Sequence, residues 1–244
     1  MLGVYWDTAL DVFVTKVNLK KKPNTRRGLL SNLSSIFDVI GYLQPYIVPV
    51  KKLMQKLCTL GIGWDEEIPE TERVYWESWQ QDLPNLEKIS INRAYIHSEL
   101  GKVVRKELHV FCDASEIAYA AVCYLRLENT RGDVQVSFVM GRARISPIRS
   151  ISITRLELAA AVLGVRLRQF VQQELDWEMD QTVFWSDSMS VLQYINNRNR
   201  RFYTYVANRV AVIHEGSKPS DWRHIDGKNQ SCRHWIKGSE TISN

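Results

Sequence analysis

The stretch ELHVFCDASEIAYAAVCYLR, residues 107–126, is the feature that most limits how this chain can fold. Apolar residues recur at every second position from 108 to 112, a period that is typical of a half-buried β-strand. The strand would end at Asp113, and a second apolar run would return beside it as a hairpin. A carboxylate at the C-terminal end of a strand lies where α/β sheets keep their functional groups. Because an Asp there is also a common turn former, both interpretations of Asp113 stay open.

Length and composition indicate a folded globular chain with one large or two small domains. The chain has 244 residues, of which 45% are hydrophobic and 24% charged. No apolar run approaches the roughly 20 residues that a membrane helix needs. The N-terminus carries acids where a secretory signal would carry bases. We therefore expect an intracellular, cytoplasmic protein without a membrane partner. The four cysteines form no CxxC pair, which argues against a zinc site or a disulfide framework.

The sequence of residues 1–100 predicts a mainly helical module in which charge is unevenly distributed. Residues 2–17 predict a β-hairpin that would be the tail of a larger domain, and helical spacing predicts helices over 29–37, 47–57 and 69–83. Residues 16–56 contain nine Lys or Arg against the single acid Asp38, whereas residues 65–87 contain eight acids against Arg73. We interpret the first stretch as a basic outer face, which is either a solvated surface or a nucleic-acid contact. The acidic stretch would lie on the far side of the module, and residues 84–101 would connect it to the next domain.

Residues 101–244 form a second domain in which strands precede and then alternate with helices. Three strands would form an antiparallel meander, followed by an apolar helix over 156–167 and a short buried strand over 182–186. A helix near 191–195, a basic loop, a helix over 202–213 and a last strand over 221–225 complete the pattern. This order predicts an α/β domain.

Three carboxylates occupy matching places in this pattern. Asp113 and Asp187 each follow a strand, and Glu157 lies near the start of the long helix. If they converge, their mutual repulsion raises their pKa values, and Mg²⁺ or Mn²⁺ is the natural compensation. Each acid also has a plainer interpretation. Glu157 could complete a capping box with Thr154, and Asp187 could simply cap the helix that follows it.

The sequences DAS at 113–115, TRLELAA at 154–160 and WSDSMSVLQYI at 185–195 resemble the ribonuclease H domain of BEL/Pao-type retrotransposon polyproteins. The upstream sequences TRRGLLSNLSSIFDVIGYLQPYIVPVKKLMQKL and GIGWDEEIP resemble the reverse transcriptase thumb and connection of the same elements. The resemblance implies a ribonuclease H-like fold, a mixed five-stranded sheet with helices on its faces. It also implies that this fold is preceded by a mainly helical module with an α+β N-terminal part.

The resemblance implies a metal-dependent nuclease that cuts the RNA strand of an RNA–DNA hybrid. Asp113, Glu157 and Asp187 would be its catalytic residues and the ligands of Mg²⁺ or Mn²⁺. The partners would be a hybrid or another nucleic-acid duplex and the rest of a reverse transcriptase polyprotein. We expect seven basic residues to contact nucleic acid, namely Arg149, Arg155, Arg198, Arg200, Arg201, Lys51 and Lys52.

Two departures from the family pattern weaken this expectation. No two Asp are adjacent, so the chain lacks the polymerase motif, and Cys232 stands where the family has a fourth acidic ligand. We therefore expect a degenerate or truncated copy with weakened activity, and the alternative is an inactive nucleic-acid-binding remnant. A peptidase label that is used for this region of the family is not supported. An aspartic peptidase needs Asp-Thr-Gly or Asp-Ser-Gly, whereas this chain reads Asp113-Ala-Ser.

Overall fold

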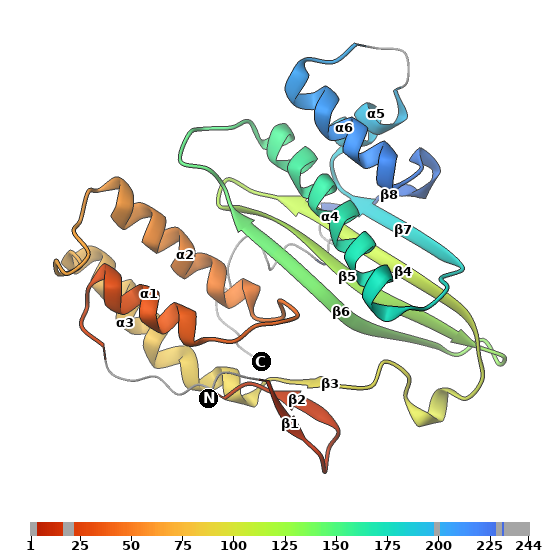
Figure 1. The fold of residues 1–244 in the computed structure, drawn as a ribbon, viewed down its shortest axis with the longest axis horizontal. Coiled ribbons are helices and arrows are strands. Elements are labelled where there is room, and N and C mark those ends of the chain that lie inside the picture. Colours follow the sequence, from red (N-terminus) through yellow and green to blue (C-terminus); the bar gives the residue numbers. More distant parts are fainter. Residues whose placement is uncertain (1–3, 17–21, 198–200, 228–230, 232–244) are drawn as a thin grey trace. The chain divides into compact units, whose positions relative to one another are not determined.

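The structure, a computed structural model, describes residues 4–16, 22–197, 201–227 and 231 (Figure 1). The chain forms two compact units. We call residues 1–39 and 49–95 the helical unit, and residues 40–48 and 96–244 the sheet unit. The boundary between residues 48 and 49 falls inside helix α2 (Gln44–Thr59).

The helical unit contains the three helices that the apolar spacing predicts. They begin at recognisable signals, since the side chain of Thr25 accepts a hydrogen bond from the Gly28 amide and Pro69 directly precedes α3. A small antiparallel sheet with strand order β1-β2-β3 completes the unit. Besides most of α2, its elements are α1 (Arg26–Ser35), α3 (Glu70–Asp82), η1 (Leu83–Lys88), β1 (Tyr5–Asp7), β2 (Val12–Val14) and β3 (Ser90–Asn92).

The N-terminal hairpin belongs to a three-stranded sheet, so the expectation that residues 84–101 are only a connection is wrong. Strand β3 pairs with β2 and comes from the segment that the sequence suggested as a plain connection. An ion pair between Arg93 and Asp11, with Nε and Oδ1 2.6 Å apart, joins the turn of the hairpin to the end of β3. The pairing was missed because it joins segments about eighty residues apart, which local spacing does not reveal.

The sheet unit is built on a mixed five-stranded sheet with strand order β6-β5-β4-β7-β8. The first three strands form the predicted antiparallel meander, while β7 runs parallel to β4 and β8 runs parallel to β7. Its elements are η2 (Ser98–Leu100), β4 (Val103–Ala114), β5 (Ala118–Asn129), β6 (Val134–Ile145), α4 (Ile153–Leu175), β7 (Gln181–Ser186), α5 (Met189–Asn196), α6 (Thr204–Gly216), η3 (Pro219–Asp221) and β8 (Trp222–His224). The α/β fold class and the five-stranded mixed sheet are thereby confirmed.

Helix α4 lies across one face of this sheet, with α6 beside it (Figure 1). The contact is close because α4 presents Gly164 to β4. A Cβ at this position would collide with Cys112 Sγ and would lie 3.3 Å from Val110 Cγ1. The buried face of β4, which includes Leu108, Val110 and Cys112, therefore packs against the backbone of α4.

The opposite face of the sheet is covered near β5 and β6 by residues 40–48. Gly141 donates a backbone hydrogen bond of 2.8 Å to the carbonyl of Ile40. The rings of Tyr42 and Phe138 meet edge to face with centroids 5.0 Å apart. Val48 is fully buried in a cluster with alanines and a valine of β5. This short segment therefore belongs to the core of the sheet unit, although it lies far upstream in the sequence.

No helix within the described ranges is both long enough and apolar enough to cross a membrane. Among the same residues, the three cysteines Cys58, Cys112 and Cys123 are free thiols.

The packing at Gly164 predicts an unusual response to Gly164→Ala. Alanine favours a helix by about 1 kcal/mol over glycine, but overfilling a packed core typically costs about 1–3 kcal/mol. We expect a net loss of stability in chemical denaturation. The additional change Cys112→Ala should remove much of the penalty, because it removes the sulfur that the new methyl group would meet. A Gly164→Ala variant more stable than the parent would show that α4 does not approach β4 this closely.

Candidate active site

Two of the three predicted acids lie at the same edge of the sheet. Strands β4 and β7 pair in parallel, and the last pair in their register is Cys112 with Ser186. Asp113 and Asp187 are the next residues along the two strands. Because neighbouring strands in a sheet are about 5 Å apart, the backbones at these two acids lie close together.

Helix α4 brings the third acid, Glu157, to the loop that follows β7. The hydroxyl of Ser188 donates a hydrogen bond of 2.6 Å to Glu157 Oε2. Burial raises the pKa of Glu157, and the negative charge of Asp187 raises it further, while the Ser188 hydrogen bond acts in the opposite direction. Glu157 and Asp187 therefore form an interacting pair of carboxyl groups in a half-buried place.

The plainer interpretations of Glu157 and Asp187 are both wrong. Helix α4 is capped by Ser152, so Thr154 and Glu157 lie inside the helix and cannot form the capping box. Helix α5 is capped by Ser188, whose side chain accepts a hydrogen bond from the Val191 amide at 3.3 Å. Neither acid therefore begins a helix.

Asp113 is 6% exposed, and its Oδ1 accepts a hydrogen bond of 2.7 Å from the Ala114 amide. Strand alternation turns Asp113 away from the face on which Cys112 packs against α4, the helix that carries Glu157. Among the residues that the structure describes, no group of three or more His, Cys, Asp or Glu side chains is arranged to hold a metal ion. Glu157 thus interacts with Asp187, and Asp113 lies near the end of the neighbouring strand β4.

The Glu157–Asp187 pair suits a hard divalent cation on chemical grounds. Carboxylate oxygens are the ligands that Mg²⁺ and Mn²⁺ prefer in proteins. Since each ionised carboxylate disfavours ionisation of the other, a bound cation would relieve a repulsion that raises the pKa of Glu157. These residues therefore fit a metal ion by donor type and electrostatics, and Asp113 lies near the end of the neighbouring strand β4.

Two of the predicted nucleic-acid-binding residues flank the start of α4. Arg149 and Arg155 are both exposed. The guanidinium of Arg155 lies over the ring of Tyr205, 5.1 Å from its centroid, and Arg209 lies over the same ring at 3.4 Å. The Tyr205 hydroxyl donates to the Arg155 carbonyl at 3.3 Å. This stack holds the first turn of α6 against α4.

The other predicted contacts are spread over the chain. Lys51 and Lys52 lie on α2 in the helical unit and are partly buried, and burial lowers the pKa of Lys51 although Asp38 opposes the shift. Arg201 is exposed and lines a cavity beside α6. Three residues singled out from the sequence lie outside the described residues, namely Arg198, Arg200 and Cys232.

The basic and acidic stretches of the helical unit are not segregated as expected. Arg27 pairs with Asp65 at 2.6 Å, and Lys56 pairs with Glu72 at 2.8 Å. The two stretches therefore attract each other within the fold, and part of the predicted basic face is neutralised. Sequence order alone could not reveal this, because the pairs join positions 38 and 16 residues apart.

Sequence reasoning also missed the role of Ser188 and a charged cluster on β4. The sequence pattern marks Ser188 only as a neighbour of a cap, yet it orients Glu157. Glu107 is 5% exposed and pairs with Arg105 at 2.6 Å and Arg126 at 2.8 Å. Burial would raise the pKa of Glu107, but its hydrogen bond with His109 and the two arginines outweigh burial and lower it. This cluster anchors the strand that carries Asp113.

Comparison with known proteins gives one family and several distant structures. The family described as Pao retrotransposon-like RNaseH-like domain matches residues 25–188. No curated protein gives a significant match. Ribonuclease H1 from Halobacterium salinarum NRC-1 is 12% identical over 51% of this chain and 88% of that chain, with a TM-score of 0.33. LC11-RNase H1 in complex with an RNA/DNA hybrid is 8% identical over 52% and 89%, with a TM-score of 0.35.

A foamy viral protease-reverse transcriptase in complex with dsDNA is 14% identical over 88% of this chain and 42% of that chain, with a TM-score of 0.27. These similarities are too distant to carry an argument about function. The function is therefore inferred from the family match and from the geometry of Asp113, Glu157 and Asp187, which we call the strand-edge acids.

The raised pKa of Glu157 predicts a pH-dependent effect of Glu157→Gln. A carboxyl group whose pKa is higher in the folded than in the unfolded state favours folding below its ordinary value of 4.5. That contribution is lost as pH rises through the folded-state pKa. Relative to the parent, we expect Glu157→Gln to gain stability between pH 4 and pH 7 in urea denaturation. The control Glu174→Gln removes an exposed glutamate of the same helix and should change stability much less. A parent-to-variant difference that is constant with pH would contradict the Glu157–Asp187 interaction.

Proposed function

Because this chain belongs to the Pao retrotransposon-like RNaseH-like domain family, whose match covers about two thirds of its length, we propose that its sheet unit hydrolyses RNA in RNA–DNA hybrids. The reaction would require Mg²⁺ or Mn²⁺. The observation that carries this proposal is the electrostatic pairing of Glu157 and Asp187 at the edge of the sheet where Asp113 lies near the end of β4. Reverse transcription is the process in which such hybrids arise, so the rest of a reverse transcriptase polyprotein is the partner that we propose. The site of action would then be inside the cell, in the cytoplasm.

The acids would act by holding a cation against the scissile phosphate. Glu157 and Asp187 would supply the first oxygen ligands, and Asp113 would supply another. A bound divalent ion would provide Lewis acidity and a water of lowered pKa, which phosphodiester hydrolysis needs. The Ser188 hydroxyl keeps Glu157 Oε2 oriented and favours its ionised form, which is the form that binds metal. Ser188 is therefore a positioning residue in this proposal.

The exposed arginines at the start of α4 would hold the hybrid by its phosphates. Arg149 precedes the helix that bears Glu157, and Arg155 lies in the first turn of that helix. Phosphate contacts fix the position of a duplex but carry little sequence information. The 2′-hydroxyl distinguishes the RNA strand from the DNA strand. We therefore expect weak sequence preference together with selectivity for the RNA strand.

A second candidate is a nucleic-acid-binding remnant that has lost its chemistry. The specific observation in its favour is that the described residues contain no group of three or more ligands arranged for a metal ion. In this case the basic residues would still bind a duplex, and the strand-edge acids would have no effect on it. The two candidates differ in whether a divalent metal changes the RNA strand.

Cleavage of a hybrid whose RNA strand is labelled tests the proposed chemistry. With millimolar Mg²⁺ or Mn²⁺ we expect the RNA strand to be cut and a DNA duplex of the same sequence to be spared. Asp113→Asn should lower the rate by more than about 100-fold, because outer-shell partners of metal ligands alone are typically worth 10- to 100-fold. Glu174→Gln, prepared in the same way, is the control. If Asp113→Asn cleaves as fast as the parent, a contaminating nuclease is responsible. If the pure parent binds hybrid without cutting it, the remnant interpretation is favoured.

Salt dependence of hybrid binding tests the proposed phosphate contacts. With about four to six phosphate contacts, the slope of log affinity against log salt should be roughly −3.5 to −5.5. Arg149→Ala and Arg155→Ala should each reduce the magnitude of the slope by about 1. Arg166→Ala removes an exposed arginine further along the same helix and should leave the slope unchanged. An affinity that does not depend on salt would remove phosphate contacts from the proposal.

A further inference from the structure

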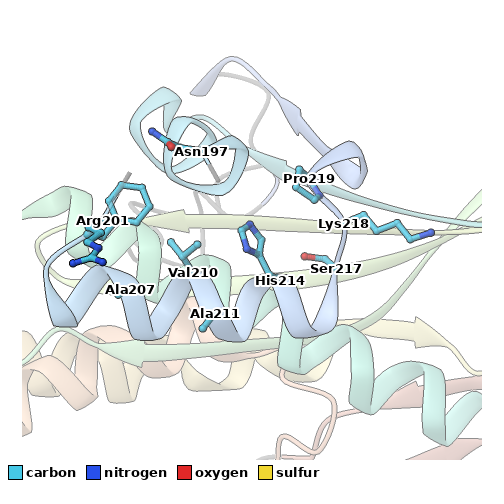
Figure 2. Close-up of a pocket in the computed structure, with 10 residues that line it drawn as sticks. Asn197, Arg201, Ala207, Val210, Ala211, His214, Ser217, Lys218 and Pro219 are labelled. Carbon is cyan, nitrogen blue, oxygen red and sulfur yellow. The ribbon is translucent and has the colours of Figure 1, made fainter. Parts of the chain in front are cut away.

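The sheet unit contains a cavity of about 710 Å³ at the opposite end of α5 from Ser188 (Figure 2). It lies between the C-terminal end of α5, one side of α6 and the start of η3. Val210 and His214 project from α6 toward the end of α5 in this view. A volume of 300–1,000 Å³ is usual for sites that take small organic molecules. The size of the cavity therefore suits a small ligand.

The lining residues that the structure describes carry positive charge at both ends of this cavity. Arg201 lies at one end and Lys218 lies at the other, with His214 between them (Figure 2). None of the lining residues within the described ranges is acidic. Within the described part of the chain, neither Arg201 nor Lys218 takes part in any of the ion pairs. Both cations are exposed. The Asp221 carboxylate accepts a hydrogen bond of 2.8 Å from the Lys218 amide, so an anion would meet less opposition at Arg201 than at Lys218.

The uncharged part of the lining is mainly apolar and rigidly held. Val210 is 6% exposed and Phe202 is half-buried, so an apolar body would cover hydrocarbon surface. His214 Nε2 lies 2.8 Å from the carbonyl of Ile195, which fixes the imidazole because a carbonyl oxygen can only accept. The Ser217 hydroxyl donates to the Ile213 carbonyl and accepts from the Trp222 indole. Recognition of a ligand therefore depends on the two cations rather than on a free hydroxyl group.

We propose that this cavity binds a small organic anion. An aromatic or aliphatic body would lie against Phe202 and Val210, and a sulfonate, carboxylate or phosphate group would meet Arg201 or Lys218. The site does not depend on the carboxylates at the sheet edge. Ser188 caps the start of α5, the cavity lies at its end, and eight helical residues span about 12 Å. A failure of hybrid cleavage would leave this proposal unaffected.

Two fluorescent probes that share one aromatic body can test the proposal on the full chain. The first is 8-anilinonaphthalene-1-sulfonate, and the second is N-phenyl-1-naphthylamine, which lacks the sulfonate. We expect one sulfonate molecule to bind per folded chain, at least about tenfold more tightly than the neutral probe. Asp113→Asn should bind both probes as the parent does, which separates this site from the strand-edge acids. Thermal melts of each protein establish that the probes report on folded chain.

Variants at the rim and inside the cavity identify where the probe binds. Arg201→Gln and Lys218→Gln together should lower sulfonate affinity about tenfold or more and change the neutral probe little. Ala211 lines the cavity and is exposed, so its substitution should not disturb folding. Ala211→Lys should strengthen sulfonate binding about two- to fivefold, and Ala211→Glu should weaken it by a similar factor. Val210→Trp should fill the cavity and exclude both probes.

Four results would overturn the proposal. One is no saturable sulfonate binding to the folded parent, and another is equal affinity for the two probes, which would make the cavity merely apolar. The third is binding that responds to the control Arg166→Ala as strongly as to Arg201→Gln and Lys218→Gln. The fourth is competition by an RNA–DNA hybrid that Arg201→Gln abolishes, which would assign Arg201 to duplex contact instead of to a small anion.

Discussion

The parallel pairing of β4 with β7 is the constraint on which the rest of the site depends. Its register ends at Cys112 and Ser186, so Asp113 and Asp187 emerge together at one edge of the sheet. Parallel strands need a crossover connection, and in this chain the crossover contains α4, which carries Glu157. One topological requirement therefore brings three acids from positions 113, 157 and 187 to the same end of the fold.

Close packing and hydrogen bonds then decide which acids interact. Gly164 lets α4 approach the buried face of β4, and the Ser188 hydroxyl binds Glu157. Asp187 raises the pKa of Glu157 through its charge. Asp113 follows Cys112 on β4, and among the described residues the three acids do not form a three-ligand group.

Sequence patterns predicted the helices and the strands of the sheet unit well, because apolar periods of 2 and 3.6 are local signals. They could not predict features that join distant segments. Strand β3 pairs with β2 across the helical unit, and residues 40–48 pack under β5 and β6. Asp113 and Asp187 were predicted from their places after strands, and Glu157 from its place near the start of a helix. The Ser188–Glu157 hydrogen bond, by contrast, required the geometry of α4. The cavity beside α6 has no sequence signal, since its lining comes from several separate elements.

The central claim is that the strand-edge acids hold a divalent cation, and Mn²⁺ binding measured by electron paramagnetic resonance tests it most directly. Titration of the purified chain should show Mn²⁺ bound to the protein and displaced by Mg²⁺. Glu157→Gln and Asp187→Asn should each weaken that binding, while Glu174→Gln should leave it unchanged. Mn²⁺ that stays free at millimolar concentration, or that binds equally to the parent and both acid variants, would contradict the account.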